Sequence, residues 1–279
     1  MQKNIDFGIL AKDIRKKLLF MHCKAGTSHI GSAFSIVEIL IILYFRILKI
    51  NPKEPKDANR DRFILSKGHA VSALYAPLAE RGFFNKEILD MYCIDGGILP
   101  GHPDRFSVPG IEASTGSLGH GLPIGVGLAF AGKKDRKNYR VFVLMSDGEC
   151  EEGSVWEAAI SASRLKLDNL AGIIDANKLQ AYEKTDNIQP ISSLKGKFEK
   201  FGWSVREVDG HNFEQLEKIF KSTPFEKEKP TMIIAHTIKG KGIPAMENKL
   251  EWHYKSPKKN QLKDFIEELD IENEKSICQ

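Results

Sequence analysis

The chain has 279 residues, which is enough to bury one large core or at most two smaller ones. Hydrophobic residues make up 42% and charged residues 28%, values that are ordinary for a soluble globular protein. The net charge of +4 is modest, and the lysines are interspersed with Asp and Glu. The charge therefore gives little reason to expect nucleic-acid binding.

Four cysteines, Cys23, Cys93, Cys150 and Cys278, show no CxxC spacing and do not describe a disulfide scaffold. A reducing cytoplasm fits this pattern better than an oxidising compartment. The longest apolar run, residues 39–45, is far short of the ~20 residues needed to span a bilayer. The amino terminus also lacks the apolar region of a signal peptide, so a cytoplasmic protein is expected.

The apolar pattern predicts helices and strands that alternate along the chain. In chain order we expect helices at 6–25 and 36–48, a strand at 63–65, helices at 70–81 and 121–133, a strand at 140–145, a helix from 154 to about 165, a strand at 170–174, a helix at 193–201, a strand at 204–208, a helix at 213–222 and a strand at 231–235. This alternation predicts an α/β fold, with a parallel sheet flanked by helices on both faces. The Lys-rich tail, residues 258–279, is expected to be a solvated helix with a frayed end.

Two segments have the spacing of a capping box, in which a Ser begins a helix and a Glu follows three residues later. They are residues 35–38 and 154–157. The pattern places Ser35 and Ser154 at the amino ends of their helices. The loop from Asp147 to Gly153 should therefore lead directly into a helix.

Oxygen-bearing side chains follow two of the predicted strands at the point where each strand ends. Ser146-Asp147-Gly148-Glu149 closes the strand at 140–145, and Asp175-Ala176-Asn177 closes the strand at 170–174. An open parallel sheet binds ligands at the carboxyl ends of its strands. A carboxylate and an amide oxygen are ligand types that Mg²⁺ or Ca²⁺ prefers, and Mg²⁺ usually adds water and a phosphate. The pair suggests a metal that bridges to a diphosphate, although each residue alone would be an ordinary turn residue.

The spacing of Asp147 and Asn177 resembles the thiamine-diphosphate signature, and the sequence of residues 147–158, 165–170 and 175–178 is similar to the amino-terminal part of a transketolase. The resemblance implies that thiamine diphosphate is the cofactor. It also implies that Asp147, Asn177 and the backbone carbonyl of Leu179 hold Mg²⁺, with Ca²⁺ or Mn²⁺ as alternatives. Ser146 departs from the Gly of the family signature, so we expect a local rearrangement near the diphosphate rather than loss of the site.

Four histidines occur in loop segments that match transketolase motifs in chain order: His29, His69, His102 and His253. Any one of them alone would more often be a helix cap or a surface residue, although imidazole can move protons near pH 7. The resemblance assigns His69 and His102 to the cofactor and the reacting hydroxyls. It assigns His29 and His253 to proton transfer at substrate hydroxyls or to phosphate contact. His29, His102 and His253 are thus the catalytic candidates and His69 a cofactor-binding candidate, with Tyr254 standing where the family has a Gly.

The loop 115–121 precedes an apolar helix and carries three glycines, at positions 116, 119 and 121, which permit close backbone approach to a ligand. A tight start to the helix would explain the same pattern. The resemblance places Gly116, Ser117 and Leu118 over the cofactor, and we expect His120 to order the loop.

The second cofactor loop contributes Gly148, Glu149 and Asn177 as further binding candidates by resemblance. Glu152 matches a family Glu that links two cofactor sites across a dimer. Considered without the resemblance, Glu149 and Glu151 are expected to be solvated. We expect a turn role for His211 and structural roles for His22 and His236.

The resemblance covers nearly the whole chain, read as one diphosphate-binding domain over residues 1–279. The pyrimidine-binding and carboxy-terminal domains of a full transketolase are not in it. The implied activity is transfer of a two-carbon ketol unit from a ketose phosphate to an aldose phosphate. We therefore expect one subunit of a split transketolase, with a separately encoded C-terminal subunit as partner and an α₂β₂ assembly built on a homodimer.

Two alternatives remain at this point. The chain could belong to another split thiamine-diphosphate enzyme of the 2-oxoacid dehydrogenase type, although the set of histidines fits a sugar with several hydroxyls better. It could also be a non-catalytic scaffold that retains the fold, which the intact Asp147, Asn177 and four histidines argue against. Candidate contact faces for a partner are the apolar segments 36–48, 121–130 and 155–162.

Overall fold

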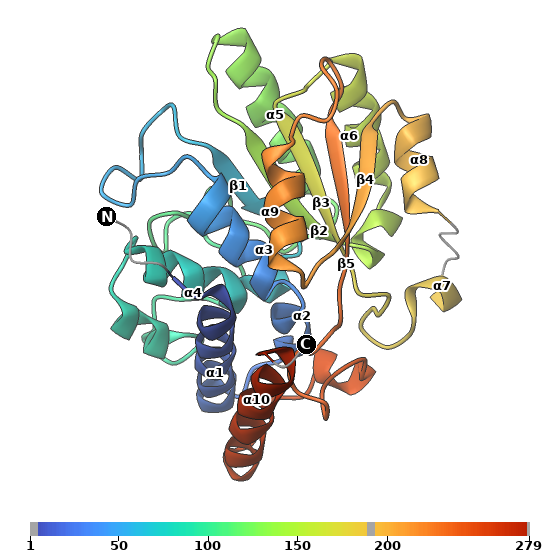
Figure 1. Ribbon diagram of the computed structural model, residues 1–279. Helices are drawn as coiled ribbons and strands as arrows, with labels where there is room; N and C mark the ends of the chain where they lie inside the picture. Colours follow the sequence, from blue (N-terminus) through green and yellow to red (C-terminus); the bar gives the residue numbers. More distant parts are fainter. Residues whose placement is uncertain (1–4, 189–192, 278–279) are drawn as a thin grey trace.

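The computed structural model describes residues 5–188 and 193–277. At its centre lies a sheet of five parallel strands, in the order β1-β2-β3-β5-β4 (Figure 1). The strands are β1 (Arg62–Leu65), β2 (Val141–Ser146), β3 (Leu170–Ala176), β4 (Ser204–Asp209) and β5 (Thr231–His236). Register pairs Ser146 with Asp175, so the loops that follow β2 and β3 begin side by side.

Helices precede and connect these strands. The α-helices are α1 (Phe7–Ala25), α2 (Ile30–Phe34), α3 (Val37–Ile42), α4 (Val71–Arg81), α5 (Gly121–Lys134), α6 (Gly153–Arg164), α7 (Thr185–Ile188), α8 (Leu194–Lys200), α9 (Phe213–Lys221) and α10 (Leu262–Ile277). A π-helical turn, η1 (Leu43–Ile47), extends α3, and short 3₁₀ turns occur at η2 (Gly68–Ala70), η3 (Lys86–Met91), η4 (Gly148–Glu151), η5 (Leu250–His253) and η6 (Lys259–Gln261).

Alternate strand residues point into two separate apolar clusters, one on each face of the sheet. Phe142 and Leu144 of β2 pack with α1, α3, α4 and α9, whereas Val141 and Val143 pack with α5, α6 and α8. Both clusters are formed by residues with little or no exposed surface. The predicted α/β fold, with a parallel sheet covered on both faces, is confirmed.

The two predicted capping boxes are wrong. The N-cap of α3 is Ile36, and Ser35 instead ends α2 and donates hydrogen bonds to the carbonyl of Ser32 and to Asp175. Ser154 lies inside α6, whose N-cap is Glu152, and its hydroxyl donates to the carbonyl of Gly119. Both hydroxyls are used in tertiary contacts with distant loops, which a local pattern does not encode.

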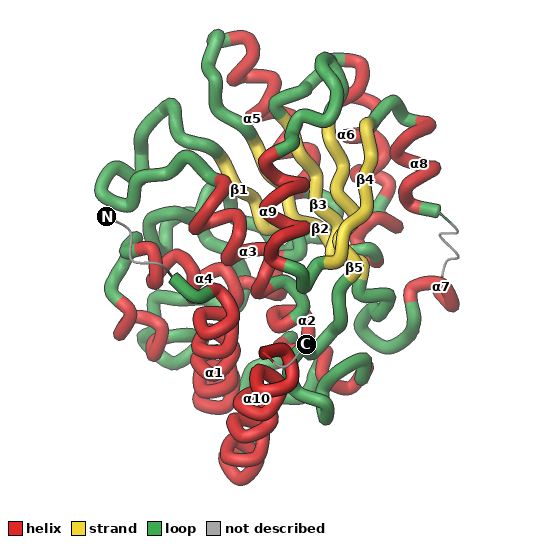
Figure 2. The backbone as a smooth tube through the Cα atoms, viewed as in Figure 1, coloured by secondary structure: helices red, strands yellow, loops and turns green. Residues whose placement is uncertain are grey.

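The tail helix is only partly solvated, contrary to the prediction for residues 258–279. α10 lies beside α1 (Figure 2), and Phe265 and Leu269 are buried against the core. The segment 36–48, predicted as a contact face, is core instead, because most of its side chains have almost no exposed surface. Residues 1–4 and 278–279, including Cys278, lie outside the described part of the chain.

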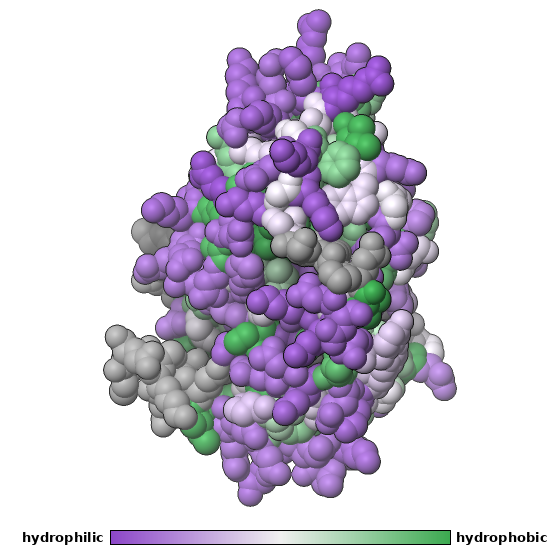
Figure 3. Space-filling model, turned by 90° about the vertical axis from the view of Figure 1, so that its right-hand side faces the viewer, coloured by the Kyte–Doolittle hydropathy of each residue, from purple (hydrophilic) through white to green (hydrophobic). Residues whose placement is uncertain are grey.

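The surface is mostly polar on the face shown in Figure 3, where apolar residues appear only as small separate patches. Within residues 5–188 and 193–277, no helix combines the length and the apolar character needed to cross a bilayer. In the same part of the chain, Cys23, Cys93 and Cys150 are free thiols.

Candidate active site

A cavity of about 340 Å³ lies where the loops after β1, β2 and β3 meet α2 and η5. It is lined by His29, Ser32, His69, His102, Gly116, Leu118, Ser146, Asp147, Gly148, Glu149, Glu151, Glu152, Asn177, Leu179, Gln180, Ala181 and His253. These residues come from segments far apart in sequence. The parallel arrangement of the strands brings them together because all the strand-following loops lie at one edge of the sheet.

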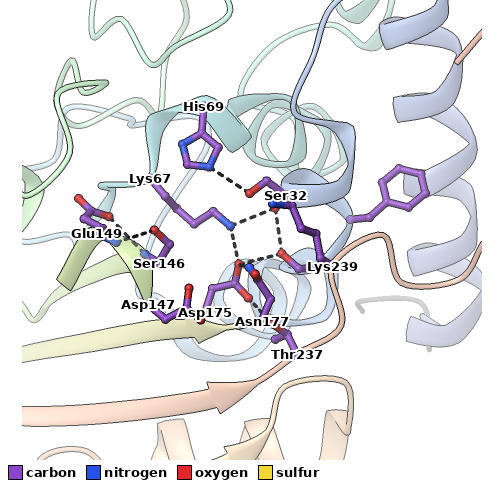
Figure 4. Close-up of polar contacts among 12 residues, drawn as sticks. Ser32, Lys67, His69, Ser146, Asp147, Glu149, Asp175, Asn177, Thr237 and Lys239 are labelled. Carbon is purple, nitrogen blue, oxygen red and sulfur yellow. Dashed lines mark hydrogen bonds and ion pairs between the residues drawn. The ribbon is translucent and has the colours of Figure 1, made fainter. Parts of the chain in front are cut away.

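Asp175, at the end of β3, organises the floor of this site (Figure 4). Its fully buried carboxylate accepts hydrogen bonds from Lys67 at 2.5 Å, from Ser35 at 2.8 Å and from the amide nitrogen of Asn177 at 2.9 Å, and a further one from the Thr237 hydroxyl. Burial acts to raise the pKa of Asp175, but the Lys67 ammonium and these hydrogen bonds outweigh it and lower that pKa. The ionised carboxylate ties together the segments that follow α2, β1, β3 and β5.

The three predicted metal ligands, Asp147, Asn177 and Leu179, all line the cavity. Asp147 accepts backbone hydrogen bonds from Gly148 at 2.8 Å and Lys178 at 2.6 Å. Asn177 donates from its amide nitrogen to Asp175, so its oxygen is the atom left to accept, here from the N–H of Leu179 at 3.1 Å. The carboxylate and amide oxygens keep further lone pairs for a cation.

The donor set fits a hard cation that also uses a phosphate. In the described residues no group of three His, Cys, Asp or Glu side chains could hold a metal ion. Burial, followed by the charge of Asp175, raises the pKa of Asp147 to about 6. A cation beside Asp147 would compensate this buried charge, and Mg²⁺ is commonly held by one carboxylate together with substrate phosphate oxygens.

Glu149 is fully buried, so the expectation that it is solvated is wrong. Its carboxylate accepts hydrogen bonds from the N–H groups of Gly119 at 2.8 Å and Ser146 at 3.2 Å, and from the Ser66 hydroxyl. Burial raises the pKa of Glu149. The residue joins the ends of β1 and β2 to the glycine loop. Glu152 is exposed at the cavity rim, and half-buried Glu151 accepts from Gln180 at 2.5 Å.

The four predicted histidines meet in this cavity. The ring of His29 lies 4.9 Å from that of His253, 5.2 Å from that of His69 and 6.4 Å from that of His102, measured between centroids. His69 also exchanges a 3.0 Å hydrogen bond with Ser32. His29 has the left-handed backbone conformation, with φ of 75°, and its N–H donates to the carbonyl of His253 at 2.8 Å. Such strain costs on the order of 1–3 kcal/mol and is concentrated at functional sites.

Burial is the main reason that three of these imidazoles stay neutral near pH 7. It lowers the pKa of His29 to about 4 and that of His253 to about 3, and it takes the pKa of His69 well below its usual range. Nearby positive charges on Lys67 and Lys239 act in the same direction. Neutral rings can both accept and donate hydrogen bonds, which suits contacts to a row of hydroxyl groups.

Lys239 is a site residue that the sequence analysis missed. Its side chain is fully buried, and its ammonium contacts the carbonyls of Gln180 at 2.8 Å and Leu179 at 3.3 Å, and Nδ1 of His253 at 2.9 Å. Burial, followed by repulsion from Lys67, lowers the pKa of Lys239 to about 8. The segment Lys239-Gly240-Lys241-Gly242, with Gly at alternate positions, was a signal that could have identified it.

Lys67 and Asp175 were also missed, although both belong to motifs already singled out. Lys67 precedes Gly68-His69, and Asp175 begins the segment that ends at Asn177. Their side chains are fully buried and form an ion pair, which leaves no local pattern in the sequence. Ser32 and Gln180 were missed for the same reason, because only the fold brings them to the cavity.

The glycine loop 115–121 closes one side of the cavity. Gly116 has φ of 154°, and a Cβ there would lie 3.1 Å from the ring of His102. Gly119 has φ of 80°, and its Cβ would lie 2.5 Å from Cβ of Glu152. Gly116 and Leu118 line the cavity, whereas Ser117 is exposed and does not, so the placement of Ser117 is the exception among the predicted residues.

The remaining histidines have the local roles expected of them. His120 Nδ1 lies 3.0 Å from the carbonyl of Leu118 and orders the loop. Buried His22 contacts Thr27 and Ser72, and exposed His236 pairs with Glu207. The N–H of His211 donates to Asp209 within a turn, as predicted, although its ring makes further contacts that are described below.

Comparison with known proteins identifies the family. Residues 10–278 match the family model for the transketolase thiamine diphosphate binding domain. The chain is 43% identical over 261 residues to an apulose-4-phosphate transketolase subunit of Phocaeicola vulgatus, and the match covers 94% of this chain and 92% of that protein. It is 40% identical over 271 residues to the 6-deoxy-6-sulfo-D-fructose transketolase subunit SqwG of Clostridium sp., covering 97% of this chain and 98% of that protein.

A solved structure agrees with this result. A transketolase of Pichia stipitis in complex with sedoheptulose-7-phosphate superposes with a TM-score of 0.88 at 27% identity. The match covers 95% of this chain and 40% of that one, so the chain spans less than half the length of that transketolase. The chain belongs to the transketolase family, in which it represents the thiamine diphosphate binding domain.

Proposed function

We propose that the chain is the thiamine-diphosphate-binding subunit of a two-component transketolase. Together with a separately encoded C-terminal subunit, it would transfer a two-carbon ketol unit from a ketose phosphate to an aldose phosphate in the cytoplasm. The observation that carries the proposal is one cavity that is lined both by the side-chain oxygens of Asp147 and Asn177 and by four imidazoles. Residues 1–279 would form the single diphosphate-binding domain of this enzyme.

The cofactor and the metal have defined places in this proposal. Asp147, Asn177 and the carbonyl of Leu179 would hold Mg²⁺, with Ca²⁺ or Mn²⁺ as alternatives. His69, Gly116, Leu118, Gly148, Glu149 and Glu152 would surround thiamine diphosphate, together with Ser117 at the outer side of the loop. When bound, thiamine diphosphate supplies the carbon nucleophile and the electron sink of the reaction. Lys67 and Lys239 would contribute positive charge near its diphosphate.

The histidines would act on the sugar. His29, His102 and His253 line the same cavity, and substrate hydroxyls placed there could donate protons to imidazole nitrogens. Tyr254 beside His253 is exposed, with its ring 6.4 Å from that of His29, so it would border the path to this cavity. A 2-oxoacid substrate has no row of hydroxyls for these groups, which favours a sugar substrate.

The test is a substrate comparison with the partner subunit present. The purified pair, supplied with thiamine diphosphate and Mg²⁺, should turn over xylulose 5-phosphate with an aldose phosphate acceptor and should not decarboxylate pyruvate. The names of the two relatives make apulose 4-phosphate and 6-deoxy-6-sulfo-D-fructose natural further donors to include. Turnover of pyruvate without any sugar activity would reject the transketolase assignment.

A further inference from the structure

His211 lies in the turn between β4 and α9, and both nitrogens of its ring have partners on other elements. Nδ1 lies 3.0 Å from a carboxylate oxygen of Glu38 in α3, and Nε2 accepts a 2.8 Å hydrogen bond from the backbone N–H of Ile238. A backbone N–H can only donate, so Nε2 carries no proton and Nδ1 must donate to Glu38. The contacts therefore select a neutral ring in one tautomer.

Glu38 is itself held by Arg15 of α1. The guanidinium contacts both carboxylate oxygens, at 2.6 and 2.8 Å, and also donates to the carbonyl of Phe34 at 3.0 Å. Arg15 and Glu38 are each only 5% exposed. Such a bidentate pair has a fixed geometry, and the charge of Arg15 compensates that of Glu38. The carboxylate can therefore accept the Nδ1–H of His211 without a second proton on the ring.

On the other side of the His211 ring, the contacts reach the candidate active site through Ile238. Ile238 directly precedes Lys239, whose buried ammonium contacts Leu179, Gln180 and His253. The backbone of the same segment makes further bonds, among them one from Gly240 N–H to the carbonyl of Gly31 and one from Asn248 N–H to that of Lys239, both 2.9 Å. At its start, the Thr237 hydroxyl donates to Asp175. Next to Lys239 itself, the bond at Ile238 is made to a side chain, whereas those at Lys239 and Gly240 are made between backbone groups.

We propose that His211 is a positioning residue for Lys239, which it holds in place through the N–H of Ile238. The inference rests on the proposed function, because it assigns to the cofactor the cavity lined by Leu179, Gln180 and His253, which Lys239 contacts. If His211 has the other tautomer, or is replaced by a side chain without an acceptor, the Ile238 N–H loses its partner. The segment that positions the Lys239 ammonium is then held less firmly. Displacement of about 1 Å in such a group has large effects on binding and turnover.

The test compares two substitutions of His211 with a matched control. His211→Leu removes the acceptor at similar volume, and His211→Gln keeps an amide oxygen near the position of Nε2. His236→Leu is the control, since His236 ends β5 and also pairs with a glutamate, Glu207, at 2.7 Å, but both partners are largely exposed. Hydrogen–deuterium exchange of segment 237–241 is measured on the isolated chain. The affinity for thiamine diphosphate with Mg²⁺ is measured by calorimetry on the chain together with its partner subunit.

We expect faster exchange in segment 237–241 and roughly 10-fold weaker cofactor affinity for His211→Leu, by analogy with residues that hydrogen-bond to metal-binding side chains and orient them. His211→Gln should restore most of both, and His236→Leu should match the wild type. Unchanged exchange and affinity in His211→Leu would overturn the proposal, as would a Gln variant no better than the Leu variant. If His211→Leu does not fold, His211→Met provides the same comparison.

The two proposals fail in different ways. A wild-type chain that fails to bind thiamine diphosphate even with its partner subunit present contradicts the proposed function, whereas the exchange measurement does not need the cofactor. Faster exchange with unchanged cofactor affinity would contradict the positioning of Lys239 while the proposed function stands.

Discussion

At the scale of single residues, the site contains buried charged side chains. Burying each charge alone would cost free energy, and pairing with an opposite charge offsets that cost. Asp175 and Lys67 are both fully buried and are stable as ions only because each has the other and several hydrogen bonds. Removing one member of such a pair leaves an uncompensated charge and costs about 3–5 kcal/mol. Asp147, by contrast, accepts from the backbone N–H groups of Gly148 and Lys178.

Asp147→Ala should abolish Mg²⁺-dependent binding of thiamine diphosphate. The substitution removes the only ionised ligand from the proposed metal site, while the diphosphate charges still need compensation. Isothermal titration of the cofactor, with and without a chelator, measures this. Wild-type affinity in the variant would refute the metal assignment.

His102→Ala should lower turnover by roughly 10²–10⁴-fold if the ring transfers a proton, and should leave metal binding intact. His102 lies against Gly116, its ring centroid is 6.4 Å from that of His29, and it is not one of the three proposed metal ligands. Steady-state kinetics with the partner subunit, alongside metal titration, separates the two effects. Weaker cofactor affinity with full turnover at saturation would contradict the catalytic role.

At the scale of secondary-structure elements, helix α5 shows how closely the layers approach. A Cβ added to Gly125 would lie 2.5 Å from Cγ2 of Val143 in β2, whereas a Cβ on Gly127 would have no neighbour within 4 Å. Both residues lie in the same helix, and only Gly125 is buried. The sheet therefore requires a glycine at one position of α5 and tolerates a side chain at the other.

Gly125→Ala should lower the free energy of unfolding by about 1–3 kcal/mol, because the added methyl group overpacks the contact with β2. The matched substitution Gly127→Ala should raise it by about 0.5–1 kcal/mol, since alanine is the better helix former. Urea denaturation at equal protein concentration compares the two variants. Equal effects of the two substitutions would show that the close approach of α5 and β2 does not prevent a side chain at position 125.

The contact between α1 and α3 should make stability depend on acid pH. Burial alone would raise the pKa of Glu38, but Arg15 and His211 lower it from 4.5 to about 2. Because the pKa of Glu38 is lower in the folded state, its ionisation stabilises the fold by on the order of 3 kcal/mol. This stabilisation is complete above the unfolded-state pKa of 4.5 and is lost as the pH falls towards 2.

Glu38→Gln should therefore reduce the slope of unfolding free energy against pH between about 4.5 and 2. It should also destabilise the chain at pH 7, because the charge of buried Arg15 loses its partner. Urea unfolding at several pH values measures both effects. If the unfolding free energy of the variant depends on acid pH as steeply as that of the wild type, a group other than Glu38 causes the dependence.

At the scale of the whole molecule, α5 and α6 lie side by side and present apolar side chains to solvent. Ile124, Phe130 and Ile160 are between 37% and 51% exposed. The buried residues of the same two helices belong to the core, so the predicted contact faces at 121–130 and 155–162 are only partly available to another chain. Obligate interfaces commonly exceed ~2,000 Å² and need more surface than these three residues provide.

We expect the isolated chain to form a homodimer and the mixture with the C-terminal subunit to form an α₂β₂ assembly that alone has transketolase activity. The physical reason is that the proposed cofactor cavity needs a second wall from another domain. Analytical ultracentrifugation of the chain, the partner and the mixture, with parallel activity assays, tests the prediction. Robust ketol transfer by the isolated chain, free of host enzyme, would contradict it.

The sequence by itself determined the features that depend on local pattern. Apolar runs located all five strands, and polar residues directly after β2 and β3 identified Asp147 and Asn177. Strand-end loops of a parallel sheet lie at one edge, so these residues could be placed together without knowing the rest of the fold. The histidine motifs were found because each is contiguous, and their meeting in one cavity agrees with that analysis.

Only the tertiary structure decided which polar groups are buried and what they contact. Ser35 donates to Asp175, which lies 140 positions further along the chain, and that contact overrides the local capping pattern. Glu149 is buried because β1 and the glycine loop fold over it, and His211 reaches Ile238 only when α3, β4 and β5 are assembled. Hydrogen-bond partners of this kind are chosen by the packing of distant segments, and no periodicity along the chain records that choice.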